Sequence, residues 1–188
     1  MKRLILLMIT CYCLLPGHAN TDIASDSLLQ VWQTLPHDTT RLSTLNDIIK
    51  IEQNNYKCIQ YSDTLMQEAL KLKNDKYASL AAYYHLLYYY NRSEQDSVAK
   101  WIVRMEPYVQ RSGLWDYFFD AQRFQIDLYT FTEQYELAIS EANKMKQKAL
   151  NTNSNRGTVA AYQCLSNAYI GSQRWDEGLK ALEEAYRL

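Results

Sequence analysis

Residues that interrupt helices are rare in this sequence of 188 amino acids. Glycine occurs five times and proline three times. A fold built from many short strands needs frequent turns, and those turns are rich in these two residues. The scarcity therefore argues against a β-sandwich or a barrel and favours long helices, in which glycine and proline are the least favourable residues.

Motifs for catalysis and for metal binding are missing as well. The sequence contains no G-x-S-x-G motif, no glycine-rich phosphate loop and no H-E-x-x-H motif. The three histidines (His18, His37 and His85) form no pair at a metal-ligand spacing. Paired acids such as Glu183 and Glu184 fall on helical faces, where carboxylates are usually solvated rather than gathered in a dry cleft. We therefore expect no enzymatic activity, no metal ion and no cofactor.

An excess of positive charge is also absent. The chain has 20 Lys and Arg residues against 21 Asp and Glu residues, for a net charge of −1. Binding to a phosphate backbone depends on clustered basic side chains, and no basic stripe is present. We expect no nucleic-acid partner.

The first 19 residues are typical of a secretory signal peptide. A basic start at residues 2–3 precedes an apolar run at residues 4–15, and the small residues Gly17 and Ala19 offer a cleavage site after Ala19. This run is too short to cross a hydrocarbon core of about 30 Å as a helix, and no second apolar stretch follows. We expect an exported protein, periplasmic or extracytoplasmic, with no membrane span after processing. An uncleaved anchor is the alternative.

Two cysteines lie beyond this segment, Cys58 and Cys164, each inside an apolar helical pattern. Because a free cysteine commonly behaves as a small core residue, two buried reduced thiols are favoured. A single disulfide in an oxidising compartment stays open as the alternative.

An internal repeat organises the rest of the chain. Tyr90, Tyr129 and Tyr169 recur at nearly equal intervals. Nine residues after each tyrosine comes a small residue: Ala99, Ala138 and Gly178. Two landmarks that share one period predict a repeat of about 40 residues.

The last unit carries the pattern most fully. It has an aromatic residue, a leucine, a small residue and a tyrosine on a first helix, then a small, a large and a small residue on a second. These are Tyr162, Leu165, Ser166, Tyr169, Gly178, Leu182 and Ala185. The pattern resembles the signature of the tetratricopeptide repeat, in which small residues let two helices approach closely. The second and third units match it in part, at Tyr83, Leu86, Tyr90, Ala99, Tyr129 and Ala138.

This resemblance implies an all-α fold, a right-handed α-solenoid of stacked antiparallel helix pairs. The units are expected at 39–73, 74–112, 114–152 and 156–188, after a capping helix at 20–38, and the array is expected to continue beyond residue 188. HEAT and armadillo arrays have a similar period, but the small-residue signature favours the tetratricopeptide type.

In that family a ligand usually lies on the concave side, against first-helix residues that point away from the second helix. The resemblance thus implies a groove for a protein or peptide ligand, formed by Tyr84, Tyr88, Asn91, Arg92, Arg123, Asp127, Thr130, Phe131, Gln163 and Asn167. Tyr84 and Tyr88, four residues apart, are expected to share its exposed face. A carboxylate clamp is not implied, because Gln163 stands where its lysine would lie.

Residues 26–29 and 36–45 resemble the beginnings of secreted tetratricopeptide segments in bacterial sensor kinases and transcriptional regulators. The implied function is that of a periplasmic input segment of a membrane-bound signalling protein, with no catalysis of its own. A free periplasmic or surface-associated adaptor that helps to assemble an envelope complex is the alternative. Both rest on likeness of fold and not on a site.

Overall fold

The structure is a computed structural model that describes residues 17–52 and 55–188. In these two ranges every regular element is an α-helix, which confirms the predicted all-α class. The helices are α1 (Gly17–Thr34), α2 (Thr39–Glu52), α3 (Lys57–Lys71), α4 (Asp75–Tyr90), α5 (Gln95–Ser112), α6 (Trp115–Phe131), α7 (Tyr135–Asn151), α8 (Asn155–Gly171) and α9 (Trp175–Tyr186). Residues 1–16 of the expected signal peptide lie outside the described ranges, and residues 17–19 form the first turn of α1.

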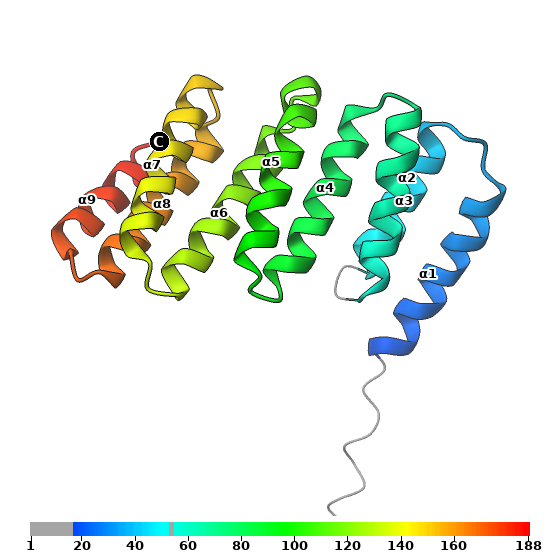
Figure 1. The fold of residues 1–188 in the computed structure, drawn as a ribbon, viewed down its shortest axis with the longest axis horizontal. Helices are drawn as coiled ribbons and strands as arrows, with labels where there is room; N and C mark the ends of the chain where they lie inside the picture. Colours follow the sequence, from blue (N-terminus) through cyan, green and yellow to red (C-terminus); the bar gives the residue numbers. More distant parts are fainter. Residues whose placement is uncertain (1–16, 53–54) are drawn as a thin grey trace, which may run out of the picture.

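The helices stand side by side in a row, from α1 at one end to α9 at the other (Figure 1). Among the described helices, contacts join only those that are adjacent in the chain or one helix apart, such as α4 with α6 and α6 with α8. This nearest-neighbour packing is typical of a helical-repeat array rather than of a closed bundle.

The repeat has a constant length in the backbone. Left-handed φ angles recur at equal intervals, in the turn after each helix from α3 to α8: at Lys73, Ser93, Gly113, Glu133, Asn153 and Gln173. After most of these turns an amide donates to a carbonyl five residues back, as from Gln134 to Tyr129 and from Arg174 to Tyr169, both at 2.8 Å. A left-handed residue with this hydrogen bond is the usual way of satisfying the last carbonyls of a helix. Two such intervals make one repeat unit, because each unit is a pair of helices.

The buried positions keep the same register. On the second helices of the units, Cys58, Val98, Ala138 and Gly178 are equivalent and buried. Val98 therefore occupies the position that the sequence pattern assigns to Ala99, which is half-buried. On the first helices Tyr89, not Tyr90, is equivalent to Tyr129 and Tyr169. The predicted register of the second unit is wrong by one residue, because three consecutive tyrosines at 88–90 make the spacing ambiguous.

Close helix packing in the last unit depends on its small residues. The Ser166 hydroxyl donates to the Gly178 carbonyl at 2.9 Å, which links α8 to α9. A Cβ atom on Gly178 would lie 2.8 Å from Cγ1 of Ile170, so no larger residue fits without a shift. Of the other predicted packing residues, those that are fully buried are Leu86, Ala138 and Leu165, and those half-buried are Tyr83, Tyr90, Tyr129, Tyr162, Tyr169 and Ala185.

Leu182 is an exception among the predicted packing residues. Half of its side chain is exposed. Its equivalents Ser62, Ile102 and Ala142 are buried, each in a unit that is followed by another. Leu182 is on α9, which lies at one end of the row in Figure 1 and, among the described helices, contacts α8 alone.

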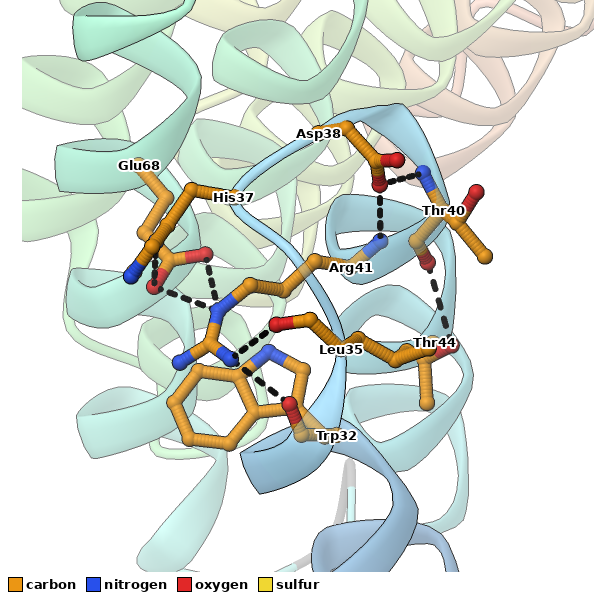
Figure 2. Close-up of polar contacts among 8 residues, drawn as sticks. All are labelled: Trp32, Leu35, His37, Asp38, Thr40, Arg41, Thr44 and Glu68. Carbon is orange, nitrogen blue, oxygen red and sulfur yellow. Dashed lines mark hydrogen bonds and ion pairs between the residues drawn. The ribbon is translucent and has the colours of Figure 1, made fainter.

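The other end of the row is covered by α1, which packs against α2 alone among the described helices. Arg41 of α2 holds this end together, as Figure 2 shows. Its Nη1 donates to the carbonyls of Trp32 and Leu35 at 2.7 and 3.1 Å, and its guanidinium lies 3.9 Å from the centre of the Trp32 ring. Because these carbonyls are at the end of α1, the Arg41 cation also meets the negative end of the helix dipole.

Candidate functional site

A hollow of about 550 Å³ opens between α6 and α8. Six predicted groove residues line it: Arg123, Asp127, Thr130 and Phe131 from α6, and Gln163 and Asn167 from α8. Cys164, Ser166 and Leu182 complete the lining. The structure thus brings together the groove positions that the sequence assigns to the third and fourth units.

Helical spacing and the repeat length together explain this gathering. Arg123, Asp127 and Thr130 are four and then three residues apart, so they share one side of α6. Gln163 and Asn167 lie one repeat after Arg123 and Asp127, and so occupy the same side of α8. The hollow is consequently built from one set of positions in two neighbouring units.

A charged pair occupies the α6 side of the hollow. The Arg123 Nη1 atom donates to the Asp127 carboxylate at 3.4 Å, and its Nε lies 3.9 Å from the carboxylate of Asp120. Burial raises the pKa of Asp127, and the Arg123 charge opposes that rise. Asp120 is also bound by Arg156 of the next unit at 2.9 Å. The charges of Arg123 and Asp127 cancel within the hollow.

The remaining lining offers both hydrogen bonds and apolar contact. Gln163 and Asn167 are exposed, and their side-chain amides make no hydrogen bond within the described part of the chain. Phe131 is 74% exposed, which is unusual for a phenylalanine. Free amides beside an exposed ring suit a peptide, whose backbone pairs with amides and whose side chains need apolar contact.

Tyr84 does not belong to this surface, and its predicted position in the groove is wrong. Its side chain is only 4% exposed, and its hydroxyl donates to Oδ1 of Asn46 at 2.9 Å. Burial also raises the pKa of Tyr84 far above its ordinary value. The error follows from the one-residue slip in the second unit. The true equivalents of Arg123, Asp127 and Thr130 there are Tyr83, Leu87 and Tyr90.

These three side chains are half-buried, and the sequence pattern did not assign them to the groove. Tyr83 packs edge-on against Tyr117 at 5.0 Å, and Tyr90 stacks on Phe124 at 4.5 Å. The buried series on the second helices is readable in the sequence and would have corrected the register: Val98, Ile102, Met105 and Val109 match Ala138, Ala142, Met145 and Ala149 one repeat later.

The remaining predicted residues of the second unit lie away from the hollow. Tyr88 is half-buried, and the guanidinium of Arg92 covers its ring at 3.5 Å. Asn91 and Arg92 are exposed just beyond the end of α4.

His85 is buried in the array, where it packs between helices. Its ring stacks on Trp101 of α5 at 4.0 Å, and its Nε2 lies 3.1 Å from the carboxylate of Asp63 on α3. Burial lowers the pKa of His85, although Asp63 opposes this. The arrangement joins three helices and leaves the ring closed to a substrate, since only 2% of the residue is exposed.

Neither cysteine is placed as a nucleophile. Cys58 and Cys164 are buried and unbridged. Burial raises the pKa of Cys58 and raises that of Cys164 to about 12, and a thiol that keeps its proton is a poor nucleophile. Within residues 17–52 and 55–188, no three His, Cys, Asp or Glu side chains converge as metal ligands. The same residues include no helix with the length and apolarity needed to span a membrane.

Comparison of the chain with known protein families, with curated proteins and with solved structures finds no match. The functional argument therefore rests on the geometry of the α6–α8 hollow and on the sequence pattern.

Proposed function

We propose that this protein is a non-catalytic scaffold of the tetratricopeptide type, a right-handed solenoid that binds a protein or peptide segment along its first helices. The helix pairs, their constant register and the close packing at Gly178 support this proposal.

The observation that carries the proposal is the repeated composition of the hollow. Equivalent positions of neighbouring units, such as Asp127 and Asn167, face the same space. Packed helices lie about 8–10 Å apart, and an extended chain rises about 3.3 Å per residue. An extended peptide that crosses the hollow would therefore meet a new set of these side chains about every three residues.

The proposed setting is outside the cytoplasm, as the input segment of a membrane-bound signalling protein. The signal-like residues 1–19 and the resemblance of residues 26–29 and 36–45 support it. In the alternative setting, a free periplasmic adaptor, the fold and the hollow are the same. Sequencing of the gene beyond residue 188 distinguishes the two, since a membrane helix followed by a kinase or DNA-binding domain favours the signalling protein.

Site-specific photocrosslinking in the native host tests the binding function. A photoreactive phenylalanine analogue replaces Phe131, whose ring is exposed in the hollow, and in the control it replaces Val103, which is 72% exposed on α5. We expect a discrete crosslinked species from position 131 alone. Equal labelling from both positions, or none from position 131, contradicts the proposal.

A further inference from the structure

A chain of alternating charges runs along α6 into the α6–α8 hollow. Its members belong to α6 and to the beginning of α8, and each lies within 4.0 Å of the next: Asp116, Arg156, Asp120, Arg123 and Asp127. Three acids alternate with two bases in this chain, which therefore carries one negative charge in excess. The network as a whole is one cation short.

Asp127 is the acid that this shortage affects most. The two ends of the charge chain are Asp116, whose side chain is 58% exposed, and Asp127, whose side chain is 18% exposed. Water solvates the first carboxylate well and the second poorly. In the described part of the protein, Arg123 is the only base within ion-pair distance of Asp127, and it also contacts Asp120. Burial raises the pKa of Asp127, which agrees with this incomplete compensation.

The groups around Asp127 complete a site for a cation. Phe131 is four residues further along α6, so its exposed ring lies on the same side of the helix. The face of an aromatic ring attracts a cation. Gln163 and Asn167 of α8 line the same hollow, and their amide oxygens accept hydrogen bonds. A guanidinium, which is planar and has several N–H donors, suits these acceptors and this ring better than an ammonium does.

The open position of this site does not result from a place at the end of the row. Among the described helices, α6 contacts α4, α5, α7 and α8, so the preceding and the following unit both pack against it. Asp127 and Phe131 therefore face the hollow although the neighbouring units are in place on both sides of α6.

We propose that the segment bound in the hollow carries an arginine, whose guanidinium pairs with Asp127 and lies against the Phe131 ring. This inference rests on the proposed peptide-binding function and adds the chemistry that the hollow selects. With the arginine in place Arg123 stays with Asp120, so that three bases alternate with three acids along the charge chain. An acidic side chain at the same point would be repelled by Asp127.

Selection from a library of random peptides on the full protein tests this inference. The peptides have about ten residues, enough in extended form to cross two units. We expect arginine to be enriched among the peptides that the wild type retains. Exchange of that arginine for citrulline, its uncharged isostere, should weaken binding about tenfold or more, as loss of a hydrogen bond between charged groups typically does.

Two asparagine variants locate the contact. In Asp127→Asn the exchange of arginine for citrulline should change the affinity by less than about twofold, because the charge that reads the arginine is already gone. Asparagine suits this position, since Asn167 occupies the equivalent place in the next unit. Asp116→Asn is the matched control: it removes the same charge from the other end of the charge chain and should keep the preference of the wild type.

The results that contradict the inference are distinct from those that contradict the proposed function. If no peptide is enriched, the peptide-binding function fails, and the arginine site fails with it. If the enriched peptides lack arginine, or if citrulline weakens binding equally in the wild type and in Asp127→Asn, only the arginine site is overturned. An equal loss of the preference in Asp116→Asn also overturns it, because the overall negative charge of the protein would then select the arginine.

Discussion

The Arg41 Nε atom donates to both carboxylate oxygens of Glu68, at 3.0 and 3.1 Å, between α2 and α3. Arg41 and Glu68 are each only 9% exposed. Loss of one partner from a buried charge pair leaves the other uncompensated and typically costs about 3–5 kcal/mol. We therefore expect Arg41→Ala to lower the free energy of unfolding by an amount in that range, measured by urea denaturation.

Arg111→Ala is the matched control for this experiment. Arg111 also makes a two-pronged contact with a carboxylate, that of Asp75, but the pair is largely solvated. Exposed pairs contribute little, so its effect should be much smaller than that of Arg41→Ala. Similar losses in the two variants would show that burial of the Arg41–Glu68 pair does not matter.

The folded protein should become less stable on acidification because His85 is buried. Burial lowers the pKa of its imidazole from the ordinary value of 6.5, so the folded protein holds the ring neutral at a pH where the unfolded chain already takes up a proton. Stability is thus complete above about pH 6.5 and decreases below it, by up to about 1.4 kcal/mol per pH unit until the folded pKa is reached. Urea unfolding at several pH values between about 5 and 8 measures this slope.

His85→Phe should flatten the slope, since phenylalanine can still stack on Trp101 but does not titrate. His37→Gln is the control, because the His37 side chain is 76% exposed. The groups that face the His85 ring are Trp101 and Asp63, and Arg104 lies over the Trp101 ring. If stability instead increased on acidification, the Asp63 charge would outweigh the burial of His85.

A glycine-to-alanine change inside α8 should destabilise the protein. In an exposed helix interior this change normally stabilises by about 1 kcal/mol. A Cβ atom on Gly157, however, would lie 2.5 Å from Cδ2 of Phe119, whose ring is buried. We expect Gly157→Ala to cost about 1–3 kcal/mol by overpacking. In the Phe119→Leu variant, Gly157→Ala should lower the free energy of unfolding by less than it does in the wild type. Equal losses in the two proteins would mean that the Phe119 ring moves aside to accommodate the Cβ atom.

Tyr84→Phe should lower stability without weakening partner binding. The change removes the hydroxyl that donates to the Asn46 amide oxygen in the first unit and leaves that buried acceptor unpaired. Such a loss costs about 1–3 kcal/mol. Thermal unfolding and the crosslinking yield at position 131 are the two measurements. An unchanged melting temperature with a reduced yield would return Tyr84 to the partner-binding surface.

The sequence predicts the class of the fold well because the same weak pattern recurs in several units of the repeat. One tyrosine means little, but tyrosines and small residues that recur together about every 40 residues indicate stacked helix pairs. The local register is less secure where several residues satisfy the pattern. In the run at 88–90 the choice of Tyr90 over Tyr89 shifted the second unit by one residue, which moved Tyr84 from the core to the surface.

The repeat pattern could not predict contacts between residues that are far apart in the sequence. Arg41 and Glu68 are far apart in the chain and occupy unrelated positions in the repeat, so no periodicity connects them. The exposure of Leu182 has a different origin. Its pattern is that of a packing residue, but α9 contacts α8 alone among the described helices, whereas α7, which carries the equivalent Ala142, packs against both α6 and α8.

Removal of the two side-chain amides that make no hydrogen bond in the hollow should weaken partner binding without lowering the stability of the fold. Gln163 and Asn167 are exposed, and their side chains hold no other part of the described chain in place. The double change Gln163→Ala with Asn167→Ala should therefore leave the urea midpoint nearly unchanged, while the crosslinking yield at position 131 falls severalfold. The change Gln147→Ala with Asn151→Ala is the control, because it removes the same amides from exposed positions on α7. If both double variants reduced the yield equally, the amides of the hollow would have no specific role, and a partner would bind the array elsewhere.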